Sequence, residues 1–203
     1  MLKKRIAVLV SGGGTNLEAL LKAERSGMIP HGEIVLVIAS NSAAYALKRA
    51  ENYGVPHAVA EKKTLGAEGF EARIEALLAE YRVDVIILAG FLSILSAEFT
   101  GRWNNRIINV HPSLIPSFCG AGAYGLKVHE MALSYGVKVT GATVHFVNEV
   151  PDGGRIILQK AVEVKENDTP ETLQRRVMEE AEWKLLPAAA ELVCRALAEG
   201  KEI

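Results

Sequence analysis

Cysteine is nearly absent from this chain, since Cys119 and Cys194 are the two found among 203 residues. They lie far apart and form no Cys-x-x-Cys pair, so neither a disulfide framework nor a zinc knuckle is expected. We interpret both as free thiols of a reducing cytoplasm. Histidine offers no alternative ligand set, because His31, His57 and His129 show no metal-ligand spacing. The sequence therefore predicts no metal site.

An excess of charge of either sign is also lacking. The 23 Lys and Arg residues nearly balance 24 Asp and Glu residues, for a formal net charge of -1. Proteins that bind nucleic acids usually carry a basic excess, so we expect no nucleic-acid partner.

Long apolar runs are missing as well. The longest, residues 83–95, is broken by Asp84, Gly90 and Ser93, and a membrane helix needs roughly 20 apolar residues. The apolar start at residues 6–10 is too short for a signal peptide and ends in glycines. We therefore expect a soluble, cytoplasmic protein with small-molecule substrates and no membrane contact, as a monomer or homodimer.

What the chain does have is an alternation of apolar runs and helical patterns, typical of a parallel sheet with crossover helices. Strands are expected at 6–10, 34–40, 57–60, 83–89 and 107–110, with helices at 16–26, 43–53 and 69–81. Thr15 or Asn16 is the expected N-cap of the first helix. Residues 137–147 and 156–164 predict a pair of antiparallel strands. A helix beginning at Pro170 should break at Pro187 and resume to Glu199.

These patterns predict an α/β fold: a Rossmann-like, doubly wound, mostly parallel sheet with an antiparallel C-terminal hairpin and a C-terminal helix. No linker, repeat or low-complexity segment interrupts the chain, so we expect a single domain.

Three glycines, Gly12 to Gly14, follow the first strand and open a helix. Backbone N–H groups at a helix N-terminus attract anions, and glycine lets a phosphate approach closely. The dinucleotide fingerprint would need glycine at Leu17 and an acidic residue after the second strand, and the Walker lysine is absent. The loop thus favours a phosphate other than that of NAD or ATP. A tight turn that needs glycine for its backbone is the alternative.

A second group of polar residues lies where a buried strand ends. Asn109 and His111 are two residues apart, and Asp152 lies downstream in a Pro-Asp-Gly-Gly turn. An amide, an imidazole and a carboxylate suggest addition to a carbonyl without a metal. Taken singly, each could be an ordinary strand-end or turn residue. His145, which alternates with Thr143 and Val147, is interpreted as a structural histidine in preference to a site residue.

These segments resemble the phosphoribosylglycinamide formyltransferases, which are folate-dependent enzymes of purine synthesis. The resemblance covers almost the whole chain and is carried by residues 8–17, 88–95, 109–116, 141–147 and 152–154. It implies one formyltransferase domain over 1–203, with a phosphate-binding front half (1–105) and a catalytic and folate-binding back half (106–203). The implied reaction transfers a formyl group from 10-formyltetrahydrofolate to the amine of 5-phosphoribosylglycinamide.

The resemblance also implies a site, residue by residue. Its catalytic residues are Asn109, His111 and Asp152, with Asp152 expected to keep His111 protonated. The substrate-binding residues for phosphoribosylglycinamide are Gly14, Thr15, Asn16 and Glu182. The formylfolate-binding residues are Leu88, Leu92, Ser93, Ile94, Leu95 and Asn109. The chain departs from many relatives at Ser93, where arginine is common, and at Arg155, where proline is common.

Two other interpretations remain open. One is another formyl enzyme, such as methionyl-tRNA formyltransferase or formyltetrahydrofolate hydrolase, although we expect neither the C-terminal tRNA-binding domain nor the N-terminal regulatory domain that these usually carry. The other is a non-catalytic module that binds phosphate or folate. The complete set of Asn109, His111 and Asp152 argues against it.

Overall fold

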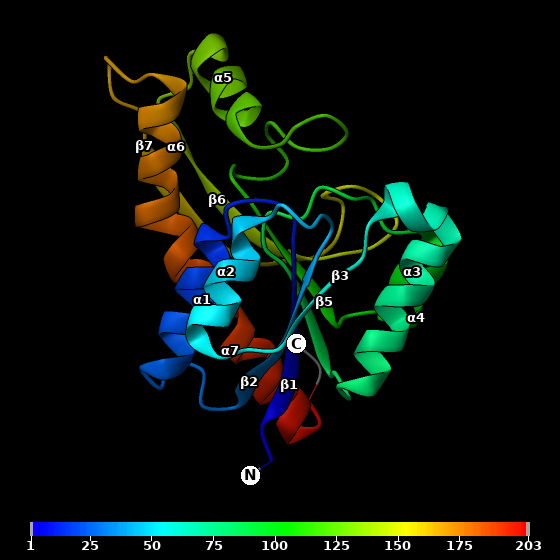
Figure 1. The fold of residues 1–203 in the computed structure, drawn as a ribbon. Coiled ribbons are helices and arrows are strands. Elements are labelled where there is room, and N and C mark those ends of the chain that lie inside the picture. The colour runs from blue at the N-terminus through cyan, green and yellow to red at the C-terminus, as the bar shows by residue number, and fades with distance from the viewer. Residues whose placement is uncertain (1, 202–203) are drawn as a thin grey trace.

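The computed structural model describes residues 2–201 (Figure 1). Met1, Glu202 and Ile203, which belong to the predicted domain, lie outside the described residues. The strands are β1 (Lys4–Val10), β2 (Gly32–Ala39), β3 (His57–Val59), β4 (Val85–Leu88), β5 (Ile107–His111), β6 (Val139–Phe146) and β7 (Ile156–Glu163). The helices are α1 (Thr15–Arg25), α2 (Tyr45–Tyr53), α3 (Lys62–Glu80), α4 (Ala97–Arg102), α5 (Leu126–Tyr135), α6 (Pro170–Val177) and α7 (Trp183–Glu199), with a π-helical segment (Met178–Glu182) between the last two.

Within the described residues the strands form one sheet in the order β3-β2-β1-β4-β5-β6-β7. Strands β1 to β5 pair in parallel, whereas β6 runs antiparallel to β5 and β7 antiparallel to β6. The predicted mostly parallel sheet with an antiparallel C-terminal hairpin is therefore confirmed.

Helices cover both faces of the sheet (Figure 1). On one face α1, α2 and α7 contribute buried side chains such as Leu20, Ala46 and Leu186 to a core against β1 and β2. On the other face, α3 and α4 contribute Phe70 and Phe99 to a second core. Buried strands with both faces covered explain the continuous apolar runs in the sequence.

The chain includes two helices that the sequence analysis did not predict. The short α4 is capped by Ser96, whose hydroxyl accepts a hydrogen bond from the Phe99 N–H at 3.1 Å. Helix α5 buries Val128 and Ala132, one turn apart, and is capped at its C-terminus by Gly136. It lies beside α6 above the carboxyl edge of the sheet (Figure 1).

Two local predictions were wrong. The N-cap of α1 is Gly14, and neither Thr15 nor Asn16 caps the helix with its side chain. Gly14 has φ 74°, and a Cβ there would lie 2.7 Å from the Cβ of Ala46, so the backbone itself requires glycine.

The C-terminal helix also differs from its prediction. It does not break at Pro187, because α7 runs from Trp183 to Glu199 with Pro187 inside it. The irregularity lies one turn earlier, in the π-helical segment that ends at Glu182. A proline ring crowds the carbonyl four residues before it, which here belongs to Trp183, so the distortion falls at the start of α7.

Among residues 2–201, no helix is both long enough and apolar enough to pass through a bilayer.

Candidate active site

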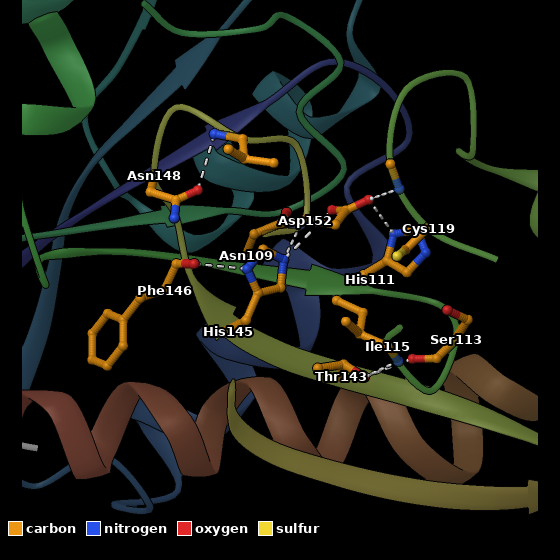
Figure 2. A network of polar contacts seen from close by, with 12 residues as sticks. Asn109, His111, Ser113, Ile115, Cys119, Thr143, His145, Phe146, Asn148 and Asp152 are labelled. Carbon is orange, nitrogen blue, oxygen red and sulfur yellow. Dashed lines mark hydrogen bonds and ion pairs between the residues drawn. The ribbon is translucent and has the colours of Figure 1, made fainter. Parts of the chain in front are cut away.

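The candidate site lies at the carboxyl edge of the parallel strands, where open α/β sheets bind their ligands. The glycine loop follows β1, residues 89–95 follow β4, and Asn109 and His111 lie at the end of β5. Because these two residues are two apart on a strand, their side chains point to the same face. The turn between β6 and β7 brings Asp152 to the same place (Figure 2).

Asp152 contacts both His111 and the loop that follows it. Its Oδ2 lies 3.4 Å from Nδ1 of His111 and accepts a hydrogen bond from the Gly120 N–H at 2.8 Å. Burial acts to raise the pKa of Asp152, but the contacts with His145, Gly120 and His111 outweigh it, so this pKa lies below its ordinary value. The carboxyl is therefore ionised at neutral pH.

His111 is buried, with 4% of its surface exposed. Burial lowers its pKa and outweighs the opposing charge of Asp152, so the pKa lies below 6.5. The charge of Asp152 and the hydrogen bond to the Phe118 carbonyl act in the opposite direction, so the expectation that Asp152 keeps His111 protonated stays a prediction. Its Nε2 lies 2.9 Å from the carbonyl oxygen of Phe118, to which it donates. Donation to a substrate oxygen therefore requires that this hydrogen bond be exchanged.

His145 is a site residue that the sequence analysis assigned a structural role only. It lies directly opposite Asn109 in the antiparallel register of β5 and β6. Its Nε2 lies 3.1 Å from Nδ2 of Asn109 and 3.5 Å from Oδ1 of Asp152, and its Nδ1 lies 2.7 Å from the carbonyl oxygen of Phe146. Its alternation with Thr143 showed which residues share its face, but the pairing with Asn109 depends on the register of two distant strands.

Two cavities meet at this group of side chains. The first, of about 120 Å³, is lined by residues that include Leu88, Ser93, Ile94, Leu95, His145 and Val147. The second, of about 210 Å³, is lined by residues that include Asn16, His111, His129, Gln174, Met178 and Glu182. Asn109 and Asp152 line both cavities. A molecule in each cavity would thus meet its neighbour beside the same amide and the same carboxylate.

The structure brings together most of the predicted site residues. Of the predicted folate-binding residues, Leu92 lines the second cavity, whereas the others line the first. Gly14 and Thr15 are not among the described residues that line either cavity. Thr15 does reach the second cavity's wall indirectly, because its hydroxyl lies 3.8 Å from the sulfur of Met178.

Glu182 and Asn16 form a buried pair in the second cavity. The Asn16 Nδ2 donates to Glu182 Oε2 at 2.6 Å, while Oδ1 of Asn16 has no hydrogen-bond partner among the described residues. Burial raises the pKa of Glu182 to about 7. The π-helical turn that ends at this residue is a distortion that often marks functional sites.

The raised pKa of Glu182 leads to a prediction about stability. A carboxyl that binds its proton more tightly when folded destabilises the protein as pH rises from its unfolded value near 4.5 to about 7. As pH rises through this window, we expect the Tm of Glu182→Gln to increase by several degrees relative to the Tm of the wild type. One pKa unit is about 1.4 kcal/mol, and 1 kcal/mol shifts Tm by about 2–4 °C at this size. Thermal unfolding between pH 4 and 8.5 measures the difference.

The control is Glu179→Gln, which removes an exposed carboxylate from the same π-helical segment. Parallel Tm curves for wild type and Glu182→Gln across the window would contradict the raised pKa.

Within residues 2–201, no three His, Cys, Asp or Glu side chains gather in a group that could hold a metal ion.

The amino-acid sequence of this chain is similar to those of known proteins. A family profile described as formyl transferase matches residues 4–190. The chain is 46% identical over 192 residues to the trifunctional purine biosynthetic protein adenosine-3 of Gallus gallus, covering 94% of this chain and 18% of that protein. It therefore spans about a fifth of the length of this relative.

Other similar proteins are closer in length. The chain is 38% identical over 194 residues to the chloroplastic phosphoribosylglycinamide formyltransferase of Arabidopsis thaliana, covering 95% of this chain and 66% of that protein. The crystal structure of glycinamide ribonucleotide transformylase 1 from Symbiobacterium toebii matches with a TM-score of 0.89 at 40% identity, covering 96% of this chain and 89% of that one.

Proposed function

The chain belongs to the formyl transferase family, and on this basis we propose that it transfers a formyl group from 10-formyltetrahydrofolate to the amine of 5-phosphoribosylglycinamide. The product would be the formylglycinamide ribonucleotide of de novo purine biosynthesis. The observation that carries the proposal is the meeting of two cavities at Asn109 and Asp152. A transfer between two substrates needs the donor and the acceptor held on either side of one set of reacting groups.

The first cavity suits the folate donor. Leu88, Ile94, Leu95 and Val147 supply apolar walls, and Ser93 is a polar group among them. A pterin ring has apolar faces with hydrogen-bonding groups along its edges, and such ligands bind in apolar pockets with a few polar groups. Residues 92–95 lie in the segment that follows β4 at the carboxyl edge of the sheet. There the formyl end of the donor would reach Asn109.

The second cavity suits the phosphoribosylglycinamide. The Glu182 carboxylate and the Asn16 amide oxygen are buried acceptors, which match the hydroxyl and amine donors of a ribosyl-glycinamide. The N-terminus of α1 begins directly after the glycine loop, and free backbone N–H groups at a helix start favour a phosphate. Gly14 and Thr15 would contribute through this backbone rather than through the cavity wall.

The chemistry follows from where these groups lie. The glycinamide nitrogen attacks the formyl carbon and a tetrahedral oxyanion forms. Asn109 donates an amide N–H to this oxygen, and His111 donates its Nε2–H after releasing the Phe118 carbonyl. Asp152 receives the proton of the attacking nitrogen, directly or through a water molecule, and the proton passes to N10 of the folate as the C–N10 bond breaks. The substrate supplies the nucleophile, so no acyl-enzyme forms.

An absorbance assay of 10-formyltetrahydrofolate deformylation tests the proposal. We expect loss of the formyl group only when phosphoribosylglycinamide is present, and no turnover with glycinamide that lacks the phosphoribosyl group. Loss of the formyl group without any acceptor would instead identify a hydrolase. Binding of both ligands without turnover would identify a non-catalytic module.

A further inference from the structure

We propose that His145 is a positioning residue that holds the Asn109 amide with its nitrogen directed for donation to the formyl oxygen. The proposal rests on the proposed function, because it assigns His145 a role in that same transfer. It concerns a side chain that lines the first cavity and that acts through Asn109 rather than by touching the reacting atoms.

The carbonyl of Phe146 determines which ring nitrogen of His145 carries the proton. It lies 2.7 Å from Nδ1, and a carbonyl oxygen only accepts hydrogen bonds, so Nδ1 must be the donor. In a neutral imidazole the other nitrogen, Nε2, then carries a lone pair and no proton. The structure therefore assigns the Nδ1–H tautomer to His145.

The lone pair on Nε2 in turn determines how the Asn109 amide is turned. Nδ2 of Asn109 lies 3.1 Å from Nε2, so the amide donates one of its two N–H groups to the ring. The second N–H belongs to the same planar group, and its direction is set once the first is held. Oδ1 of Asp152 is 3.5 Å from Nε2, farther than Nδ2 of Asn109 at 3.1 Å, so Asn109 is the nearer partner of this nitrogen.

Without this acceptor the amide has two orientations of nearly equal shape. In one the nitrogen faces the oxyanion and stabilises it, and in the other the oxygen faces it and repels it. A ring buried to 1% exposure and paired to Asn109 in the β5–β6 register provides a rigid reference for this choice. His145 thereby removes an orientation that would oppose catalysis.

The Phe146 carbonyl is itself held in place. The Phe146 N–H donates to the Arg155 carbonyl at 2.9 Å, which ties the end of β6 to the start of β7. Gly154 packs so closely that a Cβ there would overlap the Phe146 carbonyl oxygen. The chain of contacts therefore runs from the hairpin backbone through the ring of His145 to the amide of Asn109.

Kinetics on a double-mutant cycle test the proposal. We expect His145→Phe, which keeps a ring but removes the acceptor, to lower kcat by about tenfold to hundredfold, as misplacement of a reacting group does. KM for each substrate should change by less than about threefold, because the walls of both cavities remain. In the Asn109→Ala background the same change should have almost no effect on kcat, since no amide is left to orient.

His145→Gln offers a partial rescue, because its side-chain oxygen can accept from Asn109. His57→Phe, at an exposed histidine, is the matched control and should leave kcat unchanged. A purely structural role would instead give equal losses of kcat in both Asn109 backgrounds, with losses that follow the fall in Tm, and this result would overturn the proposal.

A second measurement does not depend on turnover. Two-dimensional ¹⁵N–¹H spectra of the imidazoles, with His145 assigned by the signals lost in His145→Phe, should show a protonated Nδ1 and an unprotonated Nε2 at neutral pH. A proton on Nε2 would overturn the proposal even if the enzyme transfers formyl groups. The expected tautomer in a protein without transferase activity would place the failure in the proposed function instead.

Discussion

Asn109→Ala is expected to lower kcat by about 10²–10³-fold, which is the usual loss when one donor to an oxyanion is removed. Asn109 lies at the junction of the two cavities, and in the proposed mechanism its N–H donates to the oxygen that gains charge in the transition state. Because that charge is absent in the bound substrates, KM should change little. Steady-state kinetics with each substrate varied in turn measure both constants.

The matched control for Asn109→Ala is Asn104→Ala, an exposed asparagine just before β5. It should retain wild-type kcat and Tm. A threefold or smaller loss of kcat in Asn109→Ala, with the fold intact, would mean that another group stabilises the oxyanion.

Asp152→Asn is expected to lower kcat by about 10²–10⁴-fold, the range for loss of a proton-transfer group. The amide keeps the shape of the carboxylate and can still accept from the Gly120 N–H, but it cannot take up the proton of the attacking amine. It also removes the charge beside His111 that opposes the effect of burial on the pKa of that ring. Because the amide cannot take up the proton of the attacking amine at any pH, the loss of kcat should persist at all pH values where the wild type is active.

Stability provides an independent measurement on Asp152→Asn. The pKa of Asp152 lies below its ordinary value of 3.8, so ionisation of this group stabilises the folded state at neutral pH. That contribution is present above the unfolded pKa and is lost as pH falls through the lower folded value. The Tm of the wild type should thus exceed that of Asp152→Asn near pH 7 and approach it in acid.

A variant with unchanged kcat would show that the proton leaves by another route.

Much of the fold could be predicted from the sequence, because buried parallel strands leave apolar runs that no other element requires. The runs at 6–10 and 34–40 correspond to β1 and β2, and the two strands after residue 137 form the predicted hairpin. Helix α4 was missed because it has six residues and depends on the Ser96 cap, and helix α5 was missed because it packs against α6, a distant segment of the chain. The break assigned to Pro187 was displaced because proline crowds a carbonyl one turn before itself.

The candidate site was predictable as a set of residues but not as an arrangement. Asn109 and His111 share a face because of strand alternation, and the family resemblance is confirmed by the match over residues 4–190. The roles of these residues remain predictions. The orientation of Leu92 toward the second cavity, the burial that lowers the pKa of His111, and the place of His145 opposite Asn109 all depend on contacts between distant segments. The spacing of residues along the sequence does not predict these three features.

Gly154 lines neither cavity in the described part of the chain, yet the small size of its side chain, a single hydrogen atom, affects residues beyond its own turn. A methyl group at this position would displace the carbonyl of Phe146, and with it the reference that sets the proton of His145. An inherited change at residue 154 would then replace no residue that lines either cavity, yet on the proposed role of His145 it would disturb the direction of the Asn109 amide. Such an allele would be classified as remote from the chemistry, although its first effect would be on the chemistry itself.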